Sequence, residues 1–244
     1  MMHFRARFIS SFAAFALLAI SAATCVQAQN TAAQSTSGPQ TAGNGTYVTI
    51  DPLALVRYDN RYDVSLSFAY DHMKAGPTVL QGSNLGGLDA EGSYWFSKHW
   101  GAEGTARYYL GTSGVGSVGG GNSGANLIKG PFVSEELFLG GAEWLGPHNK
   151  HGALIAHAMV GGAHFDSHVF PDTPETVGFY NNQTALAAIV GGHMDLNRSA
   201  RWVFRITPDA VMTHYGIDYP PSNKQFDVNF ALSVGIEYKF KKKR

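Results

Sequence analysis

Apolar and polar residues alternate with a period of two through eight separate segments of this chain. Between Phe226 and Phe240, large apolar side chains occupy every second position, and the positions between them hold mainly polar or small residues. Successive side chains of a strand point to opposite faces, whereas a helix brings every third or fourth residue together. The period therefore predicts an all-β fold whose strands have one apolar and one polar face.

The alternation predicts eight strands. In the segment Phe132–Trp144 the direction of the two faces stays open, because Leu137 and Leu139 compete with Phe138 and Trp144 for the apolar face. The predicted strands are Tyr62–Asp71, Leu88–Ser97, Trp100–Leu110, Phe132–Trp144, Leu154–Val160, Leu186–Leu196, Trp202–Asp209 and Phe226–Phe240.

The connections between these segments alternate between short and long. The short ones are Lys98–His99, Pro147–His151 and Asn197–Ala200, and the long ones are Met73–Asn84, Gly111–Gly130, Phe165–Gln183 and Tyr215–Gln225. An even strand number, short periplasmic turns and longer external loops are typical of barrels in bacterial outer membranes. We therefore predict an eight-stranded antiparallel up-and-down transmembrane β-barrel.

The alternation alone does not exclude a soluble barrel, which would turn its apolar face inward. The aromatic residues favour a membrane, because they gather at both strand ends, as at two headgroup interfaces. The predicted girdle residues are Tyr70 and Tyr108 near the long loops, and Trp100, Trp202, Tyr238 and Phe240 near the short turns. Charged residues lie at mid-strand on the other face, and we predict a lumen network of Glu91, Glu103, Arg107, Arg205 and Asp209.

The two ends of the chain differ from its middle. Residues 1–28 have the layout of a secretory signal peptide, with Arg5 and Arg7 before an apolar run and small residues at the end. The only cysteine, Cys25, lies within it, so neither disulfides nor thiolate chemistry is expected afterwards. Residues 29–57 are predicted as a flexible linker and a segment of open placement, 58–240 as the barrel, and 241–244 as a basic tail.

Several kinds of site are not expected. Lys and Arg total 18, as do Asp and Glu, so nothing in the charge favours a nucleic-acid partner. The glycine pattern of residues 114–119 lacks the helix that a dinucleotide site needs. The pairs His148/His151 and His164/His168 each lack a convincing third metal ligand. We expect no cofactor, no metal and no catalytic residue.

The signal peptide, the eight alternating strands and the closing run Val234–Phe240 resemble small outer-membrane barrels of the outer-membrane-protein-A type. The resemblance covers Tyr58 to Phe240. It implies a location in the bacterial outer membrane, contact with its lipids, and a terminal aromatic strand that the barrel-assembly machinery reads. No peptidoglycan-binding domain is expected after the barrel, so a wall-anchoring role is not carried over.

The expected function is structural or adhesive, through external loops whose ligand the sequence does not identify. An eight-stranded barrel is just wide enough for side chains to fill it, which disfavours an open pore. A narrow ion-conducting pore remains an alternative because acidic residues exceed basic ones on the inward face. A lipid-modifying enzyme, suggested only by His72, His164 and His214 at the loop rim, is the third hypothesis.

Overall fold

The computed structural model describes residues 51–76, 82–112, 132–168, 179–216 and 226–240. They form eight strands, as the sequence predicts. The strands are β1 (Tyr62–Met73), β2 (Ser83–Trp95), β3 (Trp100–Thr112), β4 (Phe132–His148), β5 (Gly152–His168), β6 (Gln183–Asn197), β7 (Trp202–Thr213) and β8 (Asp227–Lys239). In the part of the chain that is described, no helix is long and apolar enough to cross a membrane.

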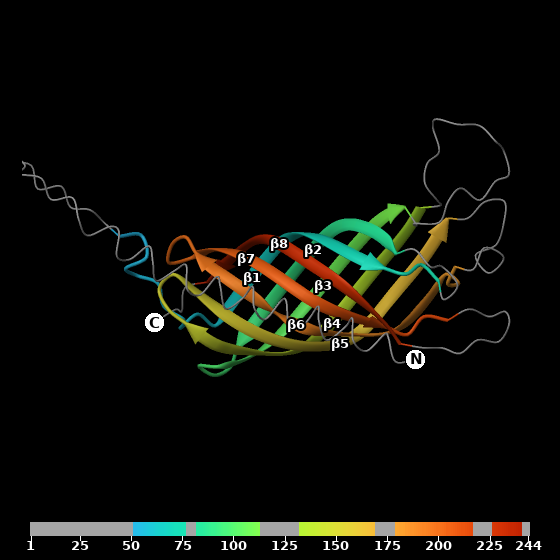
Figure 1. Cartoon of the computed structure of the whole chain (residues 1–244). Helices are drawn as coiled ribbons and strands as arrows, with labels where there is room; N and C mark the ends of the chain where they lie inside the picture. The colour runs from blue at the N-terminus through green and yellow to red at the C-terminus, as the bar shows by residue number, and fades with distance from the viewer. Residues whose placement is uncertain (1–50, 77–81, 113–131, 169–178, 217–225, 241–244) are drawn as a thin grey trace, which may run out of the picture. The chain divides into compact units, whose positions relative to one another are not determined.

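The strands form one closed barrel in sequence order (Figure 1). Each strand pairs antiparallel with the next, and β8 pairs antiparallel with β1 to complete the ring. Closure leaves no unpaired sheet edge, so backbone donors and acceptors are satisfied within the wall. The predicted up-and-down topology is confirmed.

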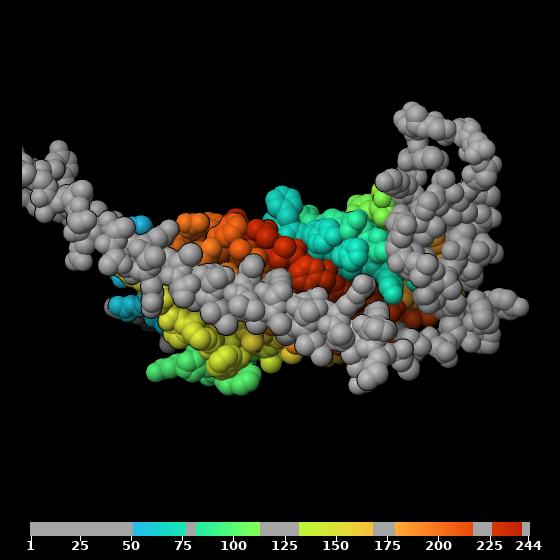
Figure 2. All heavy atoms as spheres, in the orientation of Figure 1, coloured from blue at the N-terminus to red at the C-terminus, as the bar shows by residue number. Residues whose placement is uncertain are grey.

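The barrel wall is apolar outside and polar inside. Phe68 of β1, Phe138 of β4 and Val160 of β5 project outward with 78%, 63% and 58% of their surface exposed. Figure 2 shows one outer face, to which β7 (orange) and β8 (red) contribute. This distribution is the reverse of a soluble barrel and matches hydrocarbon as the surrounding solvent. The barrel is therefore of the transmembrane kind.

The structure shows which face of β4 points outward, a question that the sequence left open. Phe138 and Trp144 point outward, whereas Leu137 and Leu139 are buried inside the barrel. The ambiguity arose because the inner face of β4 is itself apolar at the long-loop end, where Leu137 and Leu139 join a buried cluster. Alternation of hydrophobicity cannot identify the outer face of a strand where both of its faces are apolar.

Every strand except β8 is longer than predicted, and the largest shifts of a strand end are in β2 and β5. β2 begins at Ser83 and β5 continues to His168, so residues predicted as loop belong to the wall. The connections that remain between β3 and β4 and between β5 and β6 are residues 113–131 and 169–182.

The ladder between β6 and β7 is interrupted near its middle. Register pairs stop after Gly191↔Asp209 and resume at Met194↔Ile206. Pro208 lies in the gap, and proline has no backbone N–H to donate to a ladder. The interruption places His193 and Thr207, which share the gap, at an irregular point of the wall.

Candidate functional site

The lumen holds the buried charge of the molecule. Among the described residues, ten carboxylic side chains are buried there, against three lysine or arginine side chains and two histidines. The carboxylic residues are Asp63, Asp71, Asp89, Glu91, Glu103, Glu135, Glu143, Asp195, Asp209 and Glu237, and the basic ones are Arg107, Arg205, Lys239, His157 and His193. Charges in a low-dielectric interior need partners. The way these side chains pair therefore determines the chemical properties of the lumen.

Arg107, on the inner face of β3, contacts carboxylates of two other strands. Its Nε lies 3.0 Å from Asp89 Oδ2, and its Nη2 lies 3.4 Å from Glu91 Oε1 and 2.6 Å from Asp209 Oδ2. Asp89 and Glu91 belong to β2 and Asp209 to β7. One guanidinium therefore spans the lumen, as its planar fork of five donors allows.

Arg205, on β7, makes a second cross-connection. It holds Asp195 through Nε and Nη2 at 2.9 and 3.1 Å, which is the bidentate geometry typical of arginine and carboxylate. Nη2 also donates to Glu237 Oε2 at 2.9 Å, and Nη1 to Glu91 Oε2 at 3.3 Å. Glu91 lies within 3.4 Å of both guanidinium groups and so links the two arginine clusters.

Glu103 has different partners. Its Oε2 lies 3.0 Å from His157 Nδ1 and its Oε1 lies 3.0 Å from His193 Nε2. These two ring nitrogens are themselves 3.0 Å apart. Glu103, His157 and His193 come from β3, β5 and β6, and each places one possible metal-ligand atom within 4.8 Å of the others.

Strand β7 completes the surroundings of the two histidines. His157 Nε2 lies 2.8 Å from Asp209 Oδ1, and His193 Nδ1 lies 2.8 Å from Thr207 Oγ1. Gly191, which faces Asp209 across the ladder, makes this possible, because a Cβ there would collide with the Asp209 carboxylate. Each imidazole therefore has both nitrogens engaged.

The five residues predicted as a lumen network all lie in this region, buried and on the inner face. Glu91, Arg107, Arg205 and Asp209 are joined directly through the two arginines, while Glu103 reaches Asp209 through His157. Sequence reasoning missed His157, His193, Asp195 and Glu237. Their inward parity could be read from the alternation, but their height in the barrel depends on strand register, which no local pattern encodes.

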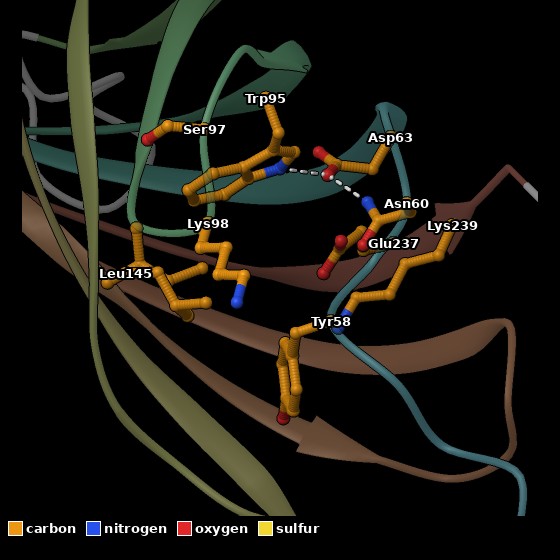
Figure 3. Close-up of a pocket in the computed structure, with 10 residues that line it drawn as sticks. Tyr58, Asn60, Asp63, Trp95, Ser97, Lys98, Leu145, Glu237 and Lys239 are labelled. Carbon is orange, nitrogen blue, oxygen red and sulfur yellow. Dashed lines mark hydrogen bonds between the residues drawn. The ribbon is translucent and has the colours of Figure 1, made fainter. Parts of the chain in front are cut away.

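The short-turn end of the lumen is closed by the segment that precedes β1. Tyr58 and Asn60 line a pocket at this end, and Figure 3 shows Asn60 and Trp95 both hydrogen-bonded to Asp63. Tyr58 Oη donates to Asn149 O at 3.0 Å and accepts from Asn197 Nδ2 at 2.7 Å, while Lys239 Nζ lies 4.5 Å from its ring centroid. Burial raises the pKa of Tyr58 to about 12.

A buried aromatic and aliphatic cluster lies at the long-loop end of the lumen. Phe165, Tyr180 and Tyr215 are buried with ring centroids 5.4 to 5.8 Å apart. Tyr215 Oη donates to Glu135 Oε1 at 2.8 Å, which fixes this aromatic cluster to β4. Side chains therefore fill both ends of the lumen as well as its centre.

The residues predicted as aromatic girdles lie at the strand ends. Tyr70, Trp100, Tyr108, Trp202 and Phe240 are exposed on the outer surface and Tyr238 is half-buried. Trp202, Tyr238 and Phe240 form one cluster with centroid separations of 5.0 and 5.1 Å. Their contact with lipid headgroups stays a prediction.

The structure places two of the histidines considered from the sequence beside other partners. His148 packs on Tyr58 with ring centroids 4.7 Å apart, and His164 Nδ1 lies 2.9 Å from Thr184 Oγ1 on the outer surface. The side chain of His168, the glycine pattern of residues 114–119, the signal peptide and the basic tail lie outside the described residues. The three-residue group with metal-ligand spacing is Glu103, His157 and His193 instead.

Comparison by sequence matches no family model and no curated protein. By structure, the chain is similar to Ail, the attachment invasion locus protein of Yersinia pestis, with a TM-score of 0.45, 16% identity, and coverage of 74% of this chain and 99% of that one. It is similar to the outer membrane protein OprG from Pseudomonas aeruginosa, with a TM-score of 0.46, 13% identity, and coverage of 76% and 98%. For outer membrane protein W of E. coli, the corresponding values are 0.37, 13%, 74% and 98%. Because these TM-scores are all below 0.5, the fold assignment rests on this chain's own strand order and register.

Proposed function

We propose that this protein is an integral barrel of the bacterial outer membrane with a structural or surface-recognition role, exercised through its long loops rather than through its lumen. The supporting observation is a lumen filled along its length by the aromatic cluster, the arginine network and the Tyr58 segment. Among the described residues, these side chains lie where a continuous water path would have to run. The outward apolar surface supports insertion in a membrane.

Conductance tests the first part of this proposal. Purified protein inserted into planar phospholipid bilayers should give no discrete current steps at neutral pH. Regular, voltage-independent steps would support the ion-conducting alternative. A matched sample of a variant shortened by residues 51–60, which include the Asp51 and Tyr58 contacts with the β4–β5 turn, tests whether this segment is what closes one end.

Surface labelling tests the orientation of the barrel. Because the only cysteine of the chain is Cys25, single cysteines can be introduced at Ser117, between β3 and β4, and at Arg198, between β6 and β7. A maleimide that does not cross membranes should label Ser117→Cys on intact cells and Arg198→Cys only after lysis. The opposite pattern would place the short turns outside and remove the long loops as recognition elements.

We also propose that the protein, which is embedded in outer-membrane lipids, is not an enzyme. Two of the three rim histidines that suggested a lipid-modifying activity have ordinary polar partners: His72 Nδ1 lies 2.8 Å from Asn84 Oδ1, and His164 Nδ1 lies 2.9 Å from Thr184 Oγ1. The ring of the third, His214, packs on Phe226 with centroids 4.6 Å apart. Thin-layer analysis of phospholipid and lipopolysaccharide incubated with the purified protein should show no new species. A product that disappears in His164→Gln would reverse this proposal.

The outward Trp202, Tyr238 and Phe240 cluster, together with the regular alternation of β8, supports recognition of the last strand by the barrel-assembly machinery. Changing Tyr238 and Phe240 to serine should reduce the amount of folded protein in the membrane fraction. Changing Phe226 and Val228, at the other end of the same face, should reduce it less. Equal losses would argue that hydrophobicity alone matters.

A further inference from the structure

The contacts among Glu103, His157 and His193 cannot all be hydrogen bonds while Glu103 is ionised. Three contacts of 3.0 Å link these residues. Each of the nitrogens His157 Nδ1 and His193 Nε2 contacts one oxygen of Glu103, and the two nitrogens contact each other. With Glu103 ionised, two protonated nitrogens would place two N–H groups against each other. If either nitrogen lacks its proton, its lone pair faces a carboxylate oxygen. As long as Glu103 is ionised, no assignment of the ring protons satisfies all three contacts.

A cation at the centre satisfies all of them, because both nitrogens and the carboxylate then present lone pairs to it. Ligand atoms about 2.0–2.1 Å from a tetrahedral zinc ion lie about 3.3 Å apart. The two ring nitrogens are 3.0 Å apart and each lies 3.0 Å from a different oxygen of Glu103, which is within a few tenths of an ångström of that value. Side-chain rotations of that size bring the three residues to ligating distance.

The outer ring nitrogens are already arranged as a metal site requires. A ligating histidine normally donates its other N–H to a carboxylate, carbonyl or water, which fixes its tautomer. With Nδ1 of His157 and Nε2 of His193 free to ligate, His157 Nε2–H donates to Asp209 at 2.8 Å and His193 Nδ1–H donates to Thr207 at 2.8 Å. The Asp209 carboxylate selects the tautomer of His157 that a metal needs, and the Thr207 hydroxyl can accept from the corresponding tautomer of His193.

The charge of the lumen also favours a bound cation. Arg107 and Arg205 make their ion pairs with Asp89, Glu91, Asp195, Asp209 and Glu237. Within the described residues, Glu103 makes its ion pairs with the two histidines alone. A divalent ion would supply a fixed positive charge to this buried carboxylate, which pairs with no lysine or arginine among the described residues.

We propose that Glu103, His157 and His193 form a binding site for a divalent transition-metal ion of the zinc class at the centre of the lumen. Two imidazole nitrogens with a carboxylate suit zinc, copper or nickel, whereas magnesium and calcium prefer oxygen ligands throughout. The ion would join β3, β5 and β6 across the barrel, so its role is to cross-link the lumen. This proposal does not depend on what the external loops recognise.

Metal content tests the proposal directly. Untagged protein carrying residues 29–244, refolded from urea into phospholipid vesicles in the presence of Zn²⁺ and then washed by gel filtration, should retain about one zinc per chain, as a preformed site with deprotonated ligands predicts. Protein purified from membranes without chelator is analysed in parallel for zinc, copper and nickel. Refolding with Co²⁺ should give the visible absorption of cobalt bound by nitrogen and oxygen ligands.

His164 provides the matched control, because it lies on β5 like His157 but on the outer surface. His157→Gln and His193→Gln should lose the bound zinc and the cobalt absorption, while His164→Gln should keep both. Heat-dependent gel migration of each variant reports whether the barrel has folded. Wild type without stoichiometric metal, or equal metal in His157→Gln and His164→Gln, overturns the site.

Thr207→Val keeps all three ligands and removes only the acceptor of His193 Nδ1–H. Loss of such an outer partner typically weakens metal binding about 10- to 100-fold. We therefore expect this variant to fold and to release zinc to a competing chelator at concentrations at least tenfold lower than wild type requires. Identical release curves would mean that His193 does not ligate, and would overturn the site even if the glutamine variants failed to fold.

Discussion

At the scale of single residues, the most consequential group is the Arg107 guanidinium. It contacts Asp89, Glu91 and Asp209 within 3.4 Å, and its side chain has no exposed surface. A buried ion pair adds little net stability when intact, but removing one partner leaves uncompensated charge in a low dielectric. Arg107→Met should therefore lower the free energy of unfolding by about 3–5 kcal/mol.

Urea titration of the barrel in vesicles, read by heat-dependent gel migration, measures this change. Arg198→Met is the control, since Arg198 is exposed in the β6–β7 turn, where its backbone N–H donates to Trp202 O. Arg107→Lys should lie between the two, because lysine keeps the charge without the fork of donors. Coincident transitions for Arg107→Met and Arg198→Met would mean that the network contributes nothing.

At the scale of the elements, the clarity of the sequence signal depended on the contrast between the two faces of each strand. β1 alternates lipid-facing Tyr62, Val64 and Leu66 with lumen-facing Asp63, Ser65 and Ser67, so its two faces were predicted correctly. β4 could not be predicted, because its inner face includes Val133, Leu137 and Leu139. β5 was predicted to end at Val160, just before Gly161 and Gly162, although the strand continues to His168.

The central histidines show a different limit. Parity alone places His157 and His193 in the lumen, but Ile155, not His157, is the register partner of His193. Their meeting with Glu103 therefore depends on the diagonal offset between β5 and β6 and on the curvature that brings β3 opposite. The pairing of whole strands sets this offset and this curvature, and neither can be predicted from single residue positions.

Two adjacent glycines of β4 give a prediction about how closely the strands approach. A Cβ on Gly141 would meet backbone atoms of Ala158 and Met159, the latter at 2.6 Å, whereas a Cβ on Gly140 has its nearest contact at 3.7 Å. Gly141→Ala should therefore destabilise the barrel by about 1–3 kcal/mol, as overpacking does. Gly140→Ala should be neutral or slightly stabilising in the same urea titration. The reverse order would contradict the β4–β5 spacing.

At the scale of the whole molecule, every inference about the lumen requires that hydrocarbon surrounds the barrel. Phe68 lies at the middle of β1 with 78% of its surface exposed, and Tyr62 lies at the short-turn end of the same strand and face with 53% exposed. An arginine on the lipid face costs about 2–4 kcal/mol at the bilayer midplane and about 0–1 kcal/mol near the interfaces. In water, by contrast, either substitution would replace an exposed apolar group by a charged one at little cost.

The pair Phe68→Arg and Tyr62→Arg therefore measures the solvent of the outer face. In phospholipid vesicles, we expect Phe68→Arg to lower the free energy of unfolding by about 2–4 kcal/mol and Tyr62→Arg by less than about 1 kcal/mol, because only the first side chain must remain in the hydrocarbon. Equilibrium urea unfolding followed by tryptophan fluorescence gives both values. Equal and small effects, together with native protein that stays dispersed without detergent, would show that water surrounds the barrel and would invalidate its membrane assignment.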